Sequence, residues 1–372
     1  MRFRKGDVLL GKLRPNLRKC VLAPFDGYCS TDIIVLRSYD GVDREFAAAM
    51  LSSEAVGAVA ERTAAGTKMP RTSWKELRNT EVFCPSEDEQ TAIAHRLISL
   101  QRAIAATATN VRKLSVAREG LVDDLLTRGL DANGELRSPA SVAAHLYQRS
   151  PLGTVPTSWK VGPLDRWLID KPRNGYSPVE APAFAGTYML GLGCLRLDGF
   201  HPCQLKFAPT GDARVSTALL DDGDLLISRA NTRQLVGLAG VYRSVGHPCI
   251  YPDLMMKLRV SNETTPEFLE LVLQASSARR QIQAAASGTS GSMVKISGAT
   301  VRALQIPRIP LPEQQRILER MAAVRQLIAA EQDQLRKLKL LKAALADDLL
   351  TGRVRVTQLL ADEPEPELQG AG

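Results

Sequence analysis

The stretch EQTAIAHRLISLQRAIAATATNVRKLSVAREGLVDDLLT, residues 89–127, returns 224 positions later as EQQRILERMAAVRQLIAAEQDQLRKLKLLKAALADDLLT, residues 313–351. Without a gap, 16 of the 39 aligned positions are identical. Chance would give about two or three, at a match rate of roughly 6% for ordinary composition. The chain therefore contains an internal repeat, and its fold must build the same structural unit twice.

Each copy also places a seam residue, mostly apolar, at alternating steps of four and three. This heptad spacing runs through both copies without a proline or an aromatic residue. It is typical of a coiled-coil helix, here about 58 Å long at ~1.5 Å per residue. The predicted coiled-coil seam consists of Ile93, Leu97, Leu100, Ile104, Val111, Leu114, Leu121, Leu125, Ile317, Met321, Val324, Ile328, Leu335, Leu338, Leu345 and Leu349.

Two helices with the same seam in one chain most simply pair with each other. The alternative is that each helix covers its own globular domain, but such a helix usually shows a wider apolar stripe. In an antiparallel pair, the polar seam residues Thr107 and Glu331 would fall near the middle and could fix the register. Gly129 and Gly352 supply matching stop signals.

The repeat continues more weakly ahead of each helix, where GDVLL at 6–10 matches GDLLI at 223–227. These regions alternate apolar and polar residues and are rich in Gly and Pro, which indicates mixed α/β globular domains. The predicted fold class is α+β: two such domains joined by two long antiparallel coiled-coil helices, with a pseudo-two-fold internal repeat.

The predicted organisation has six segments. Because the repeat length would start the first domain about 73 residues before Met1, we expect this domain to lack its N-terminal third. The segments are a first domain at 1–87, a helix at 88–130, a linker at 131–150, a second domain at 151–311, a helix at 312–356 and a flexible acidic tail at 357–372.

Composition narrows the class of protein. A chain of 372 residues with 44% apolar and 24% charged residues is typical of a globular protein with a sizeable core. The charged N-terminus and the absence of an 18-residue apolar run argue against secretion and membrane spanning. Six scattered cysteines favour a reducing compartment, so we expect a cytoplasmic protein. The net charge of +8 is a weak indication of a polyanionic partner.

Together these motifs resemble the specificity (S) subunits of type I restriction-modification systems. The resemblance rests on residues 6–15 (GDVLLGKLRP), 29–32 (CSTD), 312–315 (PEQQ), 347–352 (DDLLTG) and the opening of the second domain at 152–159. It implies two target recognition domains that each read half of a split DNA sequence. It also implies two long helices that bind methyltransferase subunits, with restriction subunits joining through the complex. The chain itself would carry no catalytic residue and no cofactor, since S-adenosylmethionine, ATP and Mg²⁺ would sit on the partners.

Candidate DNA contacts lie in two pairs of loops. The first 20 residues hold seven Lys or Arg and one acid, although a solvated charge run is the alternative. Residues 228–234 contain base-reading types, because Arg can bridge guanine and Asn or Gln can bridge adenine. Basic residues near 68–71 and 295 suit phosphate positioning. The predicted DNA-binding residues are Lys12, Arg14, Asn16, Arg18, Lys19, Lys68, Arg71, Arg229, Asn231, Arg233, Gln234 and Lys295.

Motifs for other chemistry are weak. The pairs HPC at 201–203 and HPC at 247–249 contain zinc-ligand types, but their spacing is not that of a zinc finger, so we expect no metal site. No GxxxxGK[ST] phosphate loop occurs, and a nuclease-like acid at Asp253 lacks the second acid that would hold a metal. We therefore predict a non-catalytic subunit. The alternatives are a coiled-coil assembly scaffold, a reader of one half-site and, least favoured, a stand-alone nuclease.

Overall fold

The computed structural model describes residues 1–290 and 293–356, so the tail expected at 357–372 lies outside the described residues. The chain forms two compact units. Unit 1 contains residues 1–112 and 328 onward, and unit 2 contains residues 113–327. Both long helices, α4 (Glu87–Thr127) and α8 (Leu311–Leu350), contribute residues to both units. Each unit is therefore a globular domain together with part of each long helix.

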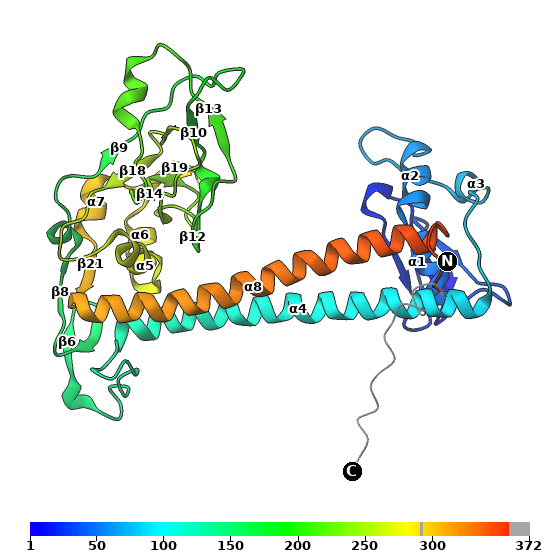
Figure 1. Ribbon diagram of the computed structural model, residues 1–372, viewed down its shortest axis with the longest axis horizontal. Coiled ribbons are helices and arrows are strands. Elements are labelled where there is room, and N and C mark those ends of the chain that lie inside the picture. The colour runs from blue at the N-terminus through cyan, green and yellow to red at the C-terminus, as the bar shows by residue number, and fades with distance from the viewer. Residues whose placement is uncertain (291–292, 357–372) are drawn as a thin grey trace. The chain divides into compact units, whose positions relative to one another are not determined.

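Unit 1 is built on a three-stranded antiparallel sheet with β2 (Val8–Gly11) at its centre. Leu10 pairs with Cys20 on one side and with Ile34 on the other. Its buried face packs apolar side chains against the helices that follow. Figure 1 shows the ribbons of these strands next to those helices. The other elements are β1 (Arg2–Phe3), the 3₁₀ turn η1 (Pro15–Leu17), β3 (Cys20–Leu22), β4 (Gly27–Tyr28), β5 (Ile33–Leu36), α1 (Arg44–Leu51), α2 (Glu54–Arg62) and α3 (Trp74–Leu77).

Unit 2 has a larger core around β14 (Leu225–Ser228), whose four residues are all buried. Its main sheet has the order β16-β14-β18-β9, and Trp159 and Trp167 are fully buried beneath it. The strands are β6 (Tyr147–Ser150), β7 (Gly153–Pro156), β8 (Lys160–Pro163), β9 (Arg173–Asn174), β10 (Tyr188–Leu190), β11 (Leu195–Arg196), β12 (Gly199–Phe200), β13 (Leu205–Phe207), β15 (Ala230–Asn231), β16 (Ala239–Val241), β17 (Cys249–Ile250), β18 (Met255–Leu258), β19 (Ser287–Ser290), β20 (Met293–Lys295) and β21 (Gln305–Arg308). The helices are α5 (Pro266–Gln274), α6 (Ser276–Ala285) and α7 (Gly298–Ala303).

The two units repeat the same topology. The order β3-β2-β5 in unit 1 corresponds to β16-β14-β18 in unit 2, and α1, α2 and α3 correspond to α5, α6 and α7. Asp7 and Asp224 occupy the same place before the central strand, and each binds a cation from the neighbouring strand or its end, Arg37 at 2.8 Å and Lys257 at 3.0 Å. The predicted α+β fold with an internal repeat is confirmed.

Within each unit the long helices run antiparallel. In unit 1, Ile93 and Leu97 near the start of α4 share a buried cluster with Leu349 near the end of α8. In unit 2, Leu125 near the end of α4 shares a cluster with Ile317 near the start of α8. All 16 predicted seam residues are buried or half-buried. Of the two polar seam residues, Thr107 is buried and Glu331 half-buried, and their role in the register stays a prediction.

Each helix stops slightly earlier than the predicted segments 88–130 and 312–356. Helix α4 ends at Thr127 because Gly129 takes a left-handed conformation with φ +66°, and α8 ends at Leu350 before Gly352 with φ +72°. A left-handed glycine after the last turn is a common helix terminator. The two glycines predicted as stops thus perform the same function in both copies.

The repeated Glu-Gln pair locks each helix start. The Gln90 amide accepts from the Asp43 backbone N–H (2.9 Å) and donates to the Pro85 carbonyl (2.9 Å). Gln314 does the same in unit 2, where it accepts from Thr264 (2.9 Å) and donates to the Ile309 carbonyl (2.8 Å). Each glutamine therefore fastens the first turn of its helix to the preceding loop.

The glutamates of the same pair bind the segment that follows the other helix. Glu89 accepts two hydrogen bonds from Arg355, at 2.8 and 2.5 Å, and these hold the pKa of Glu89 below its usual range against the opposing effect of burial. Glu313 accepts two from Arg137, at 2.6 and 3.1 Å, and one from the Leu130 backbone N–H at 2.9 Å. In each unit one buried carboxylate thus joins the start of one long helix to the segment that follows the other.

Candidate nucleic-acid interface

The loop between β2 and β3 in unit 1 carries most of the predicted contacts. Arg14 and Arg18 flank the short turn η1 and have φ values of 52° and 43°, the only positive φ values among non-glycine residues of the part of the chain that the structure describes. Left-handed backbone costs a side-chain-bearing residue about 1–2 kcal/mol, and such strain gathers at functional sites. The loop leaves Asn16 exposed at its tip.

A second segment supports this loop from the side. The backbone N–H of Arg14 donates to the Pro70 carbonyl (2.9 Å), and the N–H of Thr72 donates to the Lys12 carbonyl (3.1 Å). Arg71 then lies beside Asp32, with Nε 2.9 Å from Oδ1, and this hydrogen bond lowers the pKa of Asp32. The structure therefore brings Lys12, Arg14 and Arg71 into one basic surface, although they lie almost 60 residues apart.

The other predicted residues of unit 1 differ in how they are held. Lys19 donates to the Leu13 carbonyl at 3.4 Å, and Lys12 donates to the Thr31 carbonyl at 2.7 Å. Arg18 is half-buried and lies 3.5 Å from Glu54. Lys68 is exposed in the loop between α2 and α3. Three of these four side chains therefore have an internal partner that a ligand would have to share.

Unit 2 repeats this arrangement in the loop after β14. Strand β15 pairs with β20, so Ala230 lies opposite Lys295, and the Ile296 backbone N–H donates to the Arg229 carbonyl at 2.9 Å. Arg229 and Asn231 are half-buried and Lys295 is exposed. In both units the loop after the central strand is thus fastened to the segment before the last short helix, and the predicted residues gather there.

Two predicted residues of this loop also make internal hydrogen bonds, one through its side chain and one through its backbone. The Arg233 guanidinium donates to the Gln283 carbonyl at 2.7 Å. The Gln234 side chain is exposed, and its backbone carbonyl accepts from Arg279 at 2.6 Å. Arg233 therefore helps to dock the loop on α6, and a DNA contact by the rest of its exposed guanidinium stays a prediction.

Sequence reasoning missed Arg279, which holds this loop from beneath. Its side chain is 8% exposed and donates to the carbonyls of Gln234 and of Val236 at 2.6 and 2.7 Å. Burial lowers the pKa of Arg279. The 45 residues that separate it from the loop left no sequence signal, because a basic residue on a helix is usually solvated.

A polar cluster on unit 2 was also missed. The Tyr176 hydroxyl donates to Asp212 at 2.6 Å, and the Arg214 guanidinium lies 4.4 Å above the Tyr176 ring. The hydrogen bond to Asp212 raises the pKa of the tyrosine. Three exposed or half-exposed side chains are thereby fixed in one geometry, which suits a hydrogen-bonding surface for a polar ligand.

The His and Cys pairs have unrelated surroundings. His201 lies 3.0 Å from Asp198, whereas His247 packs edge-on against Phe184 with ring centroids 5.0 Å apart. Burial raises the pKa of Cys249 to about 12. Within residues 1–290 and 293–356 no group of three or more His, Cys, Asp or Glu side chains could hold a metal ion. Over the same residues no helix is long and apolar enough to span a membrane.

Part of the chain matches a known protein family. Residues 204–340 match the family described as the type I restriction modification DNA specificity domain. This region contains the loop after β14, helices α5 to α7 and most of α8. The predicted resemblance therefore agrees with an independent match to the second half of the chain.

Curated relatives extend the match. The chain is 27% identical over 156 residues to the type I restriction enzyme EcoKI specificity subunit of Escherichia coli (strain K12), an alignment that covers 41% of this chain and 33% of that protein. It is 22% identical over 304 residues to the MjaVIII specificity subunit of Methanocaldococcus jannaschii, covering 79% of this chain and 67% of that protein. The chain thus spans a third of the length of the first relative and two thirds of the second.

Solved structures share the fold. One, from a study of complex assembly and conformational transition of the type I R-M system, has a TM-score of 0.57 at 20% identity and covers 95% of this chain and 83% of that chain. The type I S subunit from M. genitalium has a TM-score of 0.53 at 15% identity and covers 93% and 83%. These likenesses concern the arrangement of helices and strands.

Proposed function

We propose that this chain, a member of the type I restriction-modification specificity subunits, reads DNA for such an enzyme, and that each unit reads one half of a split target. The observation that carries this proposal is the duplication of one surface. In each unit a basic loop follows the central strand and is fastened to the segment before α3 or α7. Two copies of one reading surface in a single chain favour a target with two parts.

The chemistry of the two loops suits both positioning and base reading. Their Lys and Arg side chains can bind phosphate oxygens and set position. Asn16 in unit 1 and Asn231 in unit 2 stand near arginines, and amide and guanidinium groups can bridge base edges in the major groove. We therefore expect each unit to discriminate bases as well as to bind the DNA backbone.

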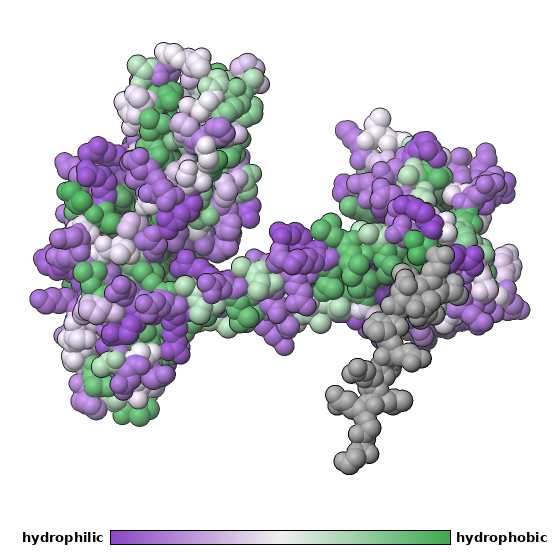
Figure 2. All heavy atoms as spheres, viewed as in Figure 1, coloured by the Kyte–Doolittle hydropathy of each residue, from purple (hydrophilic) through white to green (hydrophobic). Residues whose placement is uncertain are grey.

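The long helices are the surface we assign to the methyltransferase. In unit 1 a groove of about 720 Å³ is lined by residues of α4 and α8, including His95, Leu100 and Leu341. Leu340 and Leu341 are 65% and 53% exposed, and hydrophobic atoms gather over this part of α8 (Figure 2). Exposed leucines beside a groove are typical of a protein interface. S-adenosylmethionine, ATP and Mg²⁺ would then belong to the partner subunits, and the complex would act on DNA in the cytoplasm.

Selection from random duplexes, with the methyltransferase present, tests the reading function. A consensus of two parts separated by an unread spacer is the expected result. A single short consensus would show that only one unit reads, and an absence of salt-sensitive binding would favour a scaffold, since phosphate contacts make DNA binding depend steeply on salt.

A variant pair sharpens the test for unit 2. Replacing Arg229 and Asn231 by alanine should relax only one half of the consensus, because base contacts carry the sequence information. Arg243→Ala serves as the control, since Arg243 is exposed and paired with Glu267 at 2.8 Å outside the loop. Uniform weakening across all sequences would instead identify Arg229 and Asn231 as phosphate contacts.

Recruitment has its own test. Leu341→Asp should abolish co-purification of the methyltransferase without unfolding the chain, because Leu341 is already half-exposed. Leu338→Asp places a charge at a half-buried seam position and should also open the helix pair. Val82→Asp, at a 47% exposed position that precedes α4 and does not line the groove, is the control. Retained assembly in Leu341→Asp would remove this surface from the proposal.

A further inference from the structure

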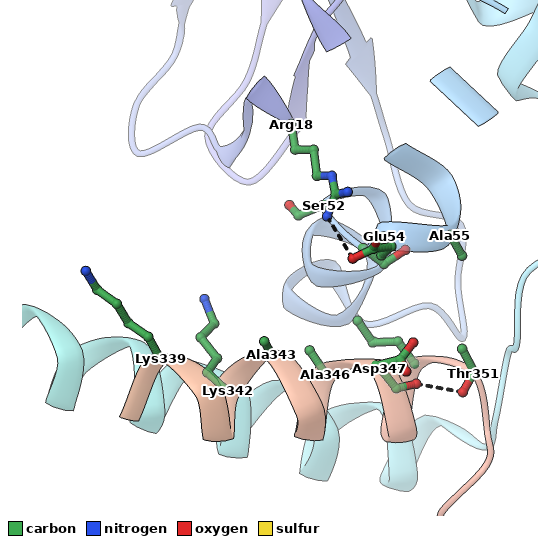
Figure 3. Close-up of a pocket in the computed structure, with 12 residues that line it drawn as sticks. Arg18, Ser52, Glu54, Ala55, Lys339, Lys342, Ala343, Ala346, Asp347 and Thr351 are labelled. Atoms are coloured by element: carbon green, nitrogen blue, oxygen red, sulfur yellow. Dashed lines mark hydrogen bonds and ion pairs between the residues drawn. The ribbon is translucent and has the colours of Figure 1, made fainter. Parts of the chain in front are cut away.

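Unit 1 contains a pocket of about 270 Å³ beside the basic loop. One wall is the chain from Ser52 to Ala55, at the end of α1 and the start of α2, and the other is the last turns of α8. Arg18 reaches down from the loop, while Lys339 and Lys342 rise from α8 toward the same space (Figure 3). Three cationic side chains from two elements therefore surround one hollow.

The acids of this pocket already have partners. Glu54 lies 3.5 Å from Arg18, and Asp347 is bound by Arg353 from outside the pocket at 2.6 Å. Lys342 donates to the neutral Gln101 amide at 2.5 Å. In the described residues neither Lys339 nor Lys342 has an ion pair. Partial burial lowers the pKa of Lys342, so this ammonium would gain from an anionic neighbour.

The internal repeat supplies an independent comparison. Positions 342 and 347 correspond to Arg118 and Asp123, which line a pocket of about 270 Å³ in unit 2 together with Ser276, the first residue of α6. There the Asp123 carboxylate accepts from the Ser276 backbone N–H (3.1 Å) and hydroxyl (2.7 Å). In unit 2 the chain thus supplies its own anion, whereas the matching Asp347 of unit 1 is turned to Arg353.

We infer that the pocket of unit 1 binds one phosphate of the DNA backbone, next to the bases that the loop at 12–19 approaches. Arg18 joins the two sites, because it ends the strained turn of the loop and also lines the pocket. Gly57 makes room for it: a Cβ there would lie 2.7 Å from Arg18 Nε. A continuous cationic path from loop to pocket suits a polyanion that extends along a surface. This inference rests on the proposed DNA-reading function.

The test is a salt titration of duplex binding by the full chain with its methyltransferase. The variant Lys339→Gln with Lys342→Gln removes two charges from the pocket. The control Arg336→Gln with Lys337→Gln removes two charges from the same helix, where both residues pair with Asp333. One lost phosphate contact should reduce the salt slope by about 0.9 and weaken binding about eightfold at 0.1 M salt. The consensus sequence should not change.

Each outcome decides a different point. Equal loss in the pocket variant and the control would mean a general charge effect, and no loss in the pocket variant would mean an unused pocket; both overturn the inference while the reading function stands. If the wild-type chain shows no salt-sensitive duplex binding, the proposed function itself fails. Another outcome is that inorganic phosphate stabilises the chain in a way that depends on Lys339 and Lys342, while the chain binds no duplex. That result, seen as a thermal shift, would show a site for free anions and refute the DNA assignment.

Discussion

Replacing Glu313 by alanine should destabilise unit 2 more than any exposed substitution on the same helix. The side chain is 4% exposed and accepts from the Leu130 backbone N–H, from Trp159 Nε1 at 3.1 Å and from both terminal nitrogens of Arg137. Alanine leaves two neutral donors and one guanidinium without their acceptor. An unsatisfied buried donor costs about 1–3 kcal/mol, and breaking one side of a buried ion pair costs about 3–5 kcal/mol.

These effects overlap, because Arg137 is 15% exposed and can regain some hydration. We therefore expect the free energy of unfolding to fall by about 4 kcal/mol. Urea titration followed by tryptophan fluorescence measures this loss in unit 2, since Trp159 and Trp167 are buried there and Trp74 in unit 1 is 46% exposed.

Two further variants of α8 make this result specific. Glu319→Ala removes an exposed carboxylate from the same helix and should change the free energy of unfolding by no more than about 0.5 kcal/mol. Glu313→Gln keeps one acceptor oxygen and should lie between wild type and alanine. A loss below about 1 kcal/mol for Glu313→Ala would refute the claim that this carboxylate joins the start of α8 to the segment that follows α4.

Three other changes follow from local geometry. Gly129→Ala should lower the melting temperature far more than Gly134→Ala: both have positive φ, but a Cβ at 129 would lie 2.2–2.3 Å from its neighbours and one at 134 meets nothing within 4 Å. Burial raises the pKa of Glu270, so the folded state holds a proton that the unfolded state has lost, and the free energy of unfolding should fall as pH rises above about 4.3. Urea midpoints measured from pH 4 to 8 should therefore show the stability of Glu270→Gln rising relative to that of wild type. A difference that stays constant with pH would contradict this. Gly57→Ala should stabilise α2 by up to about 1 kcal/mol while displacing Arg18, so DNA affinity should fall although the melting temperature does not.

The long helices and the doubled fold were predictable because their signal is periodic and local. A heptad such as that of residues 93–125 repeats one packing requirement many times, so single exceptions such as Thr107 do not hide it. The matching stop glycines were visible for the same reason, since a left-handed position after a helix nearly always selects glycine.

The partners of the site residues were not predictable. Arg71 meets Asp32 across 39 residues, and Arg279 reaches the carbonyls at 234 and 236. Both contacts arise from packing between distant segments, and sequence assigns no direction to a long side chain. Likewise nothing in the sequence indicated that one guanidinium nitrogen of Arg233 donates to the Gln283 carbonyl, and a DNA contact by this exposed residue stays a prediction.

The Glu-Gln lock has a consequence for how such a chain can vary. Most hydrogen bonds of this pair go to backbone carbonyls and N–H groups, and in each unit the glutamate also binds one arginine. The pair is Glu89 and Gln90 in unit 1, and Glu313 and Gln314 in unit 2. Backbone groups are the same whatever the side chains, so the residues between the locks are free to drift while the ends of each unit keep their geometry. The loops that we propose to contact DNA could therefore acquire new preferences by mutation with little disturbance to the long helices.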